Sequence, residues 1–153
     1  MNRLASLVLA ACFALSGCES LGGPDRLIAD LQVTGLPAGL GTEFDGVVLG
    51  GQGTTVCVGE ESVQVHEFVD AAAAMEAAAT VDRADPSMVG NAIVEWIGPP
   101  RFWLRDQVIV LYVGDDAAVD AALRTILGRP FAEDPGWGGR GAPGVRPPCV
   151  RAS

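Results

Sequence analysis

Two hydrophobic periods alternate along the middle of the chain, and each predicts a different element. Between Thr54 and Val69, apolar and polar residues alternate with a period of two, which predicts two strands joined by a tight turn at Gly59–Glu60. Asp70 and the alanine run after it predict a capped helix of about three turns. Residues 107–113 are almost entirely apolar, as in a strand buried on both faces. Residues 115–127 return to the helical period, and the glycine that follows is placed to end that helix.

The flanking segments complete a small α+β domain. PDRLIADL, from Pro24, predicts a short helix, and FDGVVLG, NAIVEWIG and FWLR predict strands. The order ββα then βββα indicates a mainly antiparallel sheet with the two helices after Asp70 and Asp115 on one face. We expect one domain over residues 24–131. Residues 132–153 are rich in glycine and proline, and we expect an irregular tail there.

The strand alternation also predicts which side chains share a face of the sheet. His66, Phe68, Trp96 and Tyr112 form a bulky face that should pack against the helices. Aligned across the strands, the opposite face carries Val63, Val65, Glu67, Ile93, Glu95, Ile97, Ile109 and Leu111. Its two carboxylates favour exposure, because burial of an unpaired carboxylate costs several kcal/mol. We name Val65, Glu67, Glu95 and Ile109 as its candidate binding residues.

An exposed apolar face of this size would be unusual on a monomer. We expect it to be covered by the apolar segments Leu27–Leu31 and Val47–Leu49. The alternatives are cover by the C-terminal tail, if a disulfide at Cys149 holds it on the sheet, and cover by a partner.

The N-terminus predicts export and a lipid anchor. The apolar run from Leu4 to Leu15 follows a single cation, Arg3, and is too short for a membrane span of about 20 residues. It has the form of a signal peptide, residues 1–17. LSGC, at Leu15–Cys18, resembles the lipobox of bacterial lipoproteins, which implies acylation of Cys18 and a short tether over residues 18–23. An ordinary secretory signal with a chance cysteine is the alternative.

Composition and charge exclude some partners. Residues 1–17 contain one of the ten arginines and none of the 19 acids, so their removal leaves 136 residues with a net charge of −10. A chain this acidic lacks the clustered cations that phosphate contacts need, so we predict no nucleic-acid binding. It is also repelled by anionic headgroups, so the acyl anchor, not a basic patch, is the expected contact with the bilayer.

The cysteines predict one disulfide. Cys12 leaves with the signal peptide and Cys18 is acylated, so Cys57 and Cys149 remain in an oxidising compartment. Metal ligation and a catalytic thiol are the alternatives, but the chain has one histidine to add to a metal site.

Carboxylates supply two candidate sites. Asp70, Asp115 and Asp116 stand just after strands, where three acids can hold a hard cation such as calcium, although helix capping also favours aspartate there. We favour capping. Glu67 and Glu95 would form a general acid/base pair if their strands are neighbours, and otherwise they are solvated strand acids.

Two further motifs have simpler readings. Cys57 and His66 are candidates for nucleophile and base, but the registers of a two-residue turn separate them by at least about 7 Å. We interpret His66 as a structural histidine. LGGQGTT weakly resembles a phosphate-binding loop, but no lysine follows and a strand replaces the helix, so we expect a turn.

One resemblance covers most of the chain, from Pro24 to Phe131. VQVHEFVDAAAAMEAAA, VEWIGPPRFWLRDQVIVLYVGDD and LGRPFA resemble a group of small lipoproteins from GC-rich bacteria. His66 departs from the larger apolar or aromatic residue expected at its position. The resemblance implies one domain in the cell envelope and implies no activity.

These observations favour a non-enzymatic envelope lipoprotein that binds a protein or a ligand, with no cofactor predicted. The alternatives are a small hydrolase or cation-dependent enzyme using the carboxylates named above, and an inhibitor-like module that presents the tail. Glu19 after the acylated cysteine weakly favours an outer membrane, because it is not the aspartate associated with inner-membrane retention.

Overall fold

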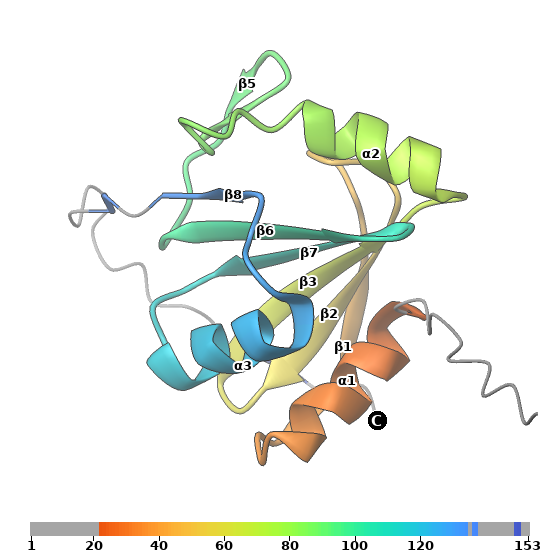
Figure 1. Ribbon diagram of the computed structural model, residues 1–153, viewed down its shortest axis with the longest axis vertical. Coiled ribbons are helices and arrows are strands. Elements are labelled where there is room, and N and C mark those ends of the chain that lie inside the picture. Colours follow the sequence, from red (N-terminus) through yellow and green to blue (C-terminus); the bar gives the residue numbers. More distant parts are fainter. Residues whose placement is uncertain (1–21, 135, 138–148, 151–153) are drawn as a thin grey trace, which may run out of the picture.

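A six-stranded antiparallel sheet forms the centre of the domain (Figure 1). The structure is a computed structural model that describes residues 22–134, 136–137 and 149–150. The strand order is β1-β2-β3-β7-β6-β8, and β4 and β5 form a separate small sheet. The elements are α1 (Gly23–Val33), β1 (Ala38–Asp45), β2 (Gln52–Val58), β3 (Glu61–Glu67), α2 (Ala71–Ala79), β4 (Met88–Val89), β5 (Ala92–Ile93), β6 (Pro100–Arg105), β7 (Val108–Val113), α3 (Ala117–Leu127) and β8 (Ala132–Glu133). The predicted α+β class with a mainly antiparallel sheet is confirmed.

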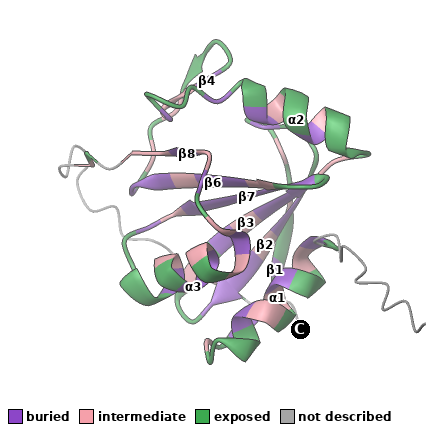
Figure 2. Ribbon diagram, in the orientation of Figure 1, coloured by how far each residue is buried: buried purple, intermediate pink, exposed green. Residues whose placement is uncertain are grey.

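The two faces of the sheet are covered by different helices. On one face, α1 and α3 pack over β2, β3, β6 and β7 through a cluster that includes Leu27, Leu31, Val119 and Leu123. On the other face, α2 contributes Ala78 to a second cluster around Phe102 and Ile109. Figures 1 and 2 show α2 on the opposite side of the sheet from α1 and α3. The sheet is therefore the middle layer of three.

This arrangement corrects the predicted helix placement. The alanine-rich helix and the helix after Asp116 lie on opposite faces, and the second helix beside α3 is α1. The central strands are apolar on both sides, so each side needs its own cover.

The predicted alignment of the faces is also wrong by one residue. Val63 pairs with Tyr112 and Val65 pairs with Val110, whereas His66 pairs with Ile109. Alternation within a strand shows which of its residues share a side, but it leaves the phase between neighbouring strands open. A shift of one residue exchanges the two faces.

Cover by the chain itself is confirmed only in part, because Ile93 and Ile97, which were assigned to the same face, are 75% and 53% exposed. Leu27 and Leu31 of α1 lie in the same cluster as Val65, and all three are fully buried. Leu49 packs instead with Ile109 and Leu111 on the α2 face. The two apolar segments thus cover opposite faces of the sheet.

Three local predictions differ from the structure. Within residues 91–98 only Ala92–Ile93 is strand, because Trp96 lies on the α2 face of the sheet in contact with Phe102. The strand expected around residues 44–50 is β1, which ends at Asp45 before a turn. The tail is not irregular from its start, since Ala132 is buried and pairs with Phe102 in the sheet.

The predicted disulfide is confirmed. Cys57 and Cys149 are bonded, with their Cα atoms 5.4 Å apart. Cys57 faces Ser62 in the β2–β3 register, so the bridge holds the end of the chain on the α2 side of the sheet.

The described residues contain no helix that is long and apolar enough to cross a membrane. Cys18 lies outside the described residues.

Candidate functional site

A groove with two adjoining compartments lies on the α2 face of the sheet. The compartments have volumes of about 330 Å³ and about 180 Å³. Gln64, Trp96 and Leu111 line both compartments, so these three residues mark where the two meet. The floor is formed by β3 and β7, and the walls come from the end of β1 and from segments outside the sheet.

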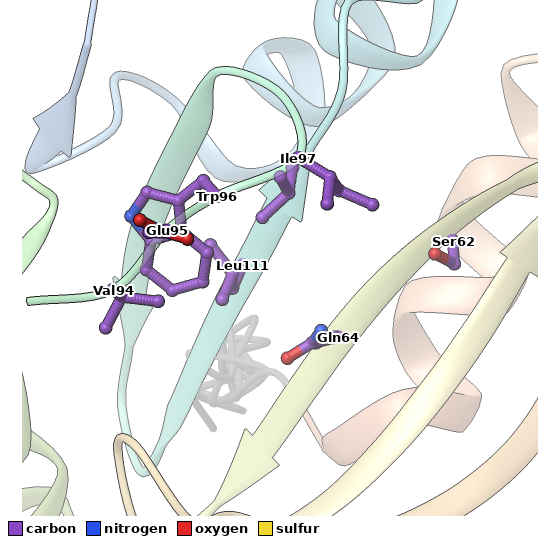
Figure 3. A pocket seen from close by; sticks show the side chains of 8 residues that line it. Ser62, Gln64, Val94, Glu95, Trp96, Ile97 and Leu111 are labelled. Carbon is purple, nitrogen blue, oxygen red and sulfur yellow. The ribbon is translucent and has the colours of Figure 1, made fainter. Parts of the chain in front are cut away.

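The larger compartment has both apolar and polar lining. Its outer wall is the irregular segment 94–97, and Figure 3 shows Trp96 and Ile97 of this segment across from Gln64 and Ser62 of β3. The remaining lining residues are Val94, Glu95, Leu111 and Val113. Ile97 is 53% exposed, so an apolar side chain stands at the rim.

The smaller compartment is enclosed by the segment that connects β1 to β2. It is lined by Phe44, Asp45, Val47, Val48, Leu49, Gln64, His66, Trp96 and Leu111. Phe44 meets His66 edge to face, with ring centroids 5.2 Å apart. Gly53 lies between these two residues in the sheet, and a Cβ there would come within 2.3 Å of the Phe44 ring. Only glycine at residue 53 leaves room for this contact.

Trp96 is held firmly between the compartments. Its indole Nε1 donates a hydrogen bond to the Pro86 carbonyl at 3.0 Å, and its ring contacts Phe102 edge to face at 5.8 Å. The ring is therefore oriented by contacts on the protein side, which preorganises the wall that it forms.

His66 is the buried polar group of the site. It is 2% exposed, and its Nδ1–H donates to the Gly50 carbonyl at 3.1 Å. This bond leaves a lone pair on Nε2, which is buried and has no hydrogen-bond partner among the described residues. Burial lowers the pKa of His66, against a smaller opposing effect of the Gly50 carbonyl, so the ring is neutral at pH 7. The imidazole is thus neutral, and its second nitrogen is buried in the wall of the smaller compartment.

The lowered pKa predicts a loss of stability in mild acid. In the unfolded chain His66 takes up a proton near pH 6.5, whereas in the folded chain it stays neutral until a lower pH. The free energy of unfolding should therefore fall between pH 7 and pH 5.5, by at most about 1.4 kcal/mol per pH unit. Urea unfolding at several pH values measures this loss. His66→Gln should flatten it, because this is the only histidine of the chain. Equal slopes in both proteins would show that His66 titrates normally when folded.

The candidate binding residues named from the sequence do not form one surface. Val65 and Ile109 are fully buried, on opposite faces of the sheet. Glu67 lies beside Gly23 at the start of α1, where a helix N-terminus favours a carboxylate. Glu95 is exposed and lines the groove. Of the four, only Glu95 belongs to the site. The predicted alignment of the strands was wrong by one residue and had therefore assigned residues of two different faces to one face.

The residues named as catalytic candidates do not come together in one site. Val65 and Glu67 point to the α1 face and Glu95 lies on the α2 face, so the two glutamates do not meet. Asp70 and Asp116 accept backbone hydrogen bonds at the starts of α2 and α3, as capping predicts. The described residues contain no group of three acids, cysteines or histidines that could hold a metal ion. Cys57 is in a disulfide and has no thiol to act as a nucleophile.

Sequence reasoning missed most of the groove. Trp96 was expected to pack under a helix from within a strand, whereas it forms a wall above the sheet. The glycine-rich stretch is a turn only up to Gly51, with positive φ at Gly50 and Gly51, because residues 52–55 belong to β2. Its carbonyl at Gly50 orients His66, a role for which the sequence carries no signal.

No family model, curated protein or solved structure matched this chain.

Proposed function

We propose that this chain is a lipid-anchored module of the bacterial cell envelope that binds a small ligand in the groove on the α2 face. The observation that carries the proposal is the preformed groove, with walls that are mostly apolar and a few polar side chains among them. Ligand sites in proteins are typically concave and mostly apolar, with a few polar groups that orient the ligand. The groove has this composition, and the acids that an enzyme would use are dispersed.

The fixed walls support binding over a purely structural role. A site that is formed before the ligand arrives avoids the cost of ordering its side chains on binding. Trp96 is oriented by Pro86 and Phe102, and His66 by Gly50. Apolar side chains also stand exposed at the rims, with Val47 91% and Ile97 53% exposed. A ligand in the groove would remove part of this apolar surface from water.

A neutral apolar dye tests the groove as a binding site. N-phenyl-1-naphthylamine should brighten on binding to the Cys18→Ala form of the chain, which cannot be acylated. Ser62→Trp should weaken binding by at least about tenfold, since Ser62 is exposed and lines the larger compartment. Gln107→Trp is the matched control, because Gln107 is exposed and lines neither compartment. Equal dye binding by the Ser62→Trp variant and the control would contradict the proposal.

The proposed location of the protein in the cell envelope rests on the N-terminal sequence. The short apolar run and LSGC at Leu15–Cys18 support cleavage before Cys18 and its acylation. The disulfide fits an oxidising compartment outside the cytoplasm. Intact mass spectrometry of the native protein tests this part, and a mature N-terminus other than acylated Cys18 would contradict it.

A further inference from the structure

The two most exposed large apolar side chains of the described residues are Val47 and Val69, at 91% and 88%. Val48, beside Val47, is exposed as well. Val69 lines neither compartment of the groove, so a ligand bound there would leave this side chain in water. Exposed apolar side chains that gather in one place on a protein tend to mark a contact surface. This surface therefore needs a partner other than the ligand of the groove.

The two valines lie at the same end of the sheet. Asp45 pairs with Gln52, and Gln52 pairs with Glu67, so the last residues of β1 and β3 are two strands apart, about 10 Å. Val47 and Val69 each follow one of these last residues by two positions, within about 7 Å of it. Residues from two separate connections thus expose apolar side chains at one end of the domain.

The chain also enters the domain at this end. A Cβ at Gly23, the first residue of α1, would collide with the Glu67 carboxylate, so α1 begins against the end of β3. Figure 1 shows the start of α1 and the connection from β3 to α2 on the same side of the molecule. Cys18 precedes Gly22 by four residues, so their Cα atoms are at most about 14 Å apart. An acylated Cys18 would therefore hold this end of the domain close to the bilayer.

The opposite end of the domain lies farther from the anchor. The Gly59 N–H donates a hydrogen bond to the Pro37 carbonyl, which places the β2–β3 turn beside the connection that follows α1. Val33, the last residue of α1, lies at this opposite end, about 15 Å along the helix from Gly23. Val33 is 87% exposed. It therefore provides a matched control for Val69, with the same side chain and the same exposure far from the anchor.

We propose that the anchor end of the domain, which carries Val47, Val48, Val69 and the start of α1, rests on the bilayer that holds the acyl chains of Cys18. The three valine side chains contact lipid, and the opposite end with Val33 stays in water. The proposal rests on the proposed function, from which it takes the acyl anchor. It adds the surface that contacts the membrane and the orientation of the domain.

The acyl anchor makes so small a contact sufficient. A few valines would not hold a free domain on a bilayer, but the anchor keeps them at its surface, where the contact forms within one molecule at a high effective concentration. Removal of apolar area from water then favours the docked orientation. Asp45, Glu67 and Asp70 each lie within two residues of Val47 or Val69, and anionic headgroups repel their charge. The expected contact is therefore apolar and made with zwitterionic lipid.

Fluorescent labels on introduced cysteines test the orientation. Val69→Cys and Val33→Cys would each be made in the full chain, labelled with nitrobenzoxadiazole and reconstituted in phosphatidylcholine vesicles that contain a nitroxide-labelled lipid. The native cysteines do not react, because Cys57 and Cys149 are bonded and Cys18 is acylated. The nitroxide should quench the label at residue 69 at least about twofold more strongly than the label at residue 33, since an interfacial contact is only about 5–10 Å deep. Equal quenching at both positions would overturn the inference.

A charge at the anchor end should release the contact. Val69→Asp should lower the quenching of a label introduced by Val47→Cys, because it places a carboxylate in the apolar contact. Val33→Asp makes the same change at the opposite end and should leave that quenching unchanged. Replacing part of the phosphatidylcholine by phosphatidylglycerol should also lower it. If Val33→Asp lowers the quenching as much as Val69→Asp does, the effect comes from overall charge and the inference fails.

The outcomes separate this inference from the proposed function. Intact mass spectrometry of each preparation shows whether Cys18 carries acyl chains, and a mature protein without them would contradict both the proposed location and this contact. If the protein is acylated and bound to the vesicles, yet the labels at residues 69 and 33 are quenched equally, the location stands and only the orientation is wrong. Dye binding in the groove is measured on the Cys18→Ala form and does not depend on either result.

Discussion

Replacing Val65 by aspartate should unfold much of the domain. Val65 is fully buried in the cluster beneath α1 and α3, opposite Val110 in the sheet, and the described residues that share this cluster are apolar. A carboxylate there would lose its hydration and gain no partner. We expect the free energy of unfolding to fall by about 3–5 kcal/mol, a large part of the stability of a domain this size. Urea unfolding followed by circular dichroism measures the change.

Val69→Asp is the matched control for this prediction. It introduces the same group four residues later, at a position that is 88% exposed. Its effect should stay within about 0.5 kcal/mol, as for most surface substitutions. A Val65→Asp variant as stable as Val69→Asp would mean that the α1 and α3 layer does not close over β3.

Removing the disulfide should have an effect of similar size. The bond joins residues separated by 92 positions in sequence, so it closes a long loop in the unfolded chain. In the chain-entropy model a loop of this length stabilises the fold by about 4–5 kcal/mol. The double variant Cys57→Ala, Cys149→Ala should therefore unfold at a much lower urea concentration than the oxidised protein.

Reduction of the unmodified protein breaks the disulfide without replacing either cysteine, so it distinguishes the effect of the bond from the effect of the side chains. The reduced form keeps both sulfur atoms, including that of the fully buried Cys57, and should lose nearly the same stability as the double variant. Identical unfolding of the oxidised and reduced forms would show that the bridge constrains little, and that the β2 end of the sheet is stable without it.

Local patterns were enough to predict most of the elements and the class of the fold. The α1 helix, the β2–β3 hairpin, the β7 strand and the two later helices follow from hydrophobic period, from aspartate caps and from a terminal glycine. These signals act over a few residues and are therefore visible in the sequence. The cysteine pairing was also predictable, because only two cysteines remained to pair in an exported chain.

The groove could not be predicted from local patterns, because segments that are distant in the sequence form it. Residues 94–97 carry a strand pattern, yet they cross the α2 face, where Trp96 contacts Phe102 and donates a hydrogen bond to the Pro86 carbonyl. Phe44, Gly53 and His66 are adjacent only through the registers of β1 with β2 and of β2 with β3. No period within one strand reports such a register.

The sequence by itself determined most of the helices and strands, the disulfide and the acidic character of this protein, since these depend on residue type and short-range spacing. The tertiary structure alone decided which face each strand residue occupies, which helix covers that face and which acids meet in one site. Glu67 and Glu95 illustrate the difference. The one-residue shift between β3 and β7 places Glu67 on the face that meets the start of α1, whereas Glu95 lines the groove because residues 94–97 lie outside the sheet. That shift is set by the packing of both cores together, to which residues throughout the chain contribute.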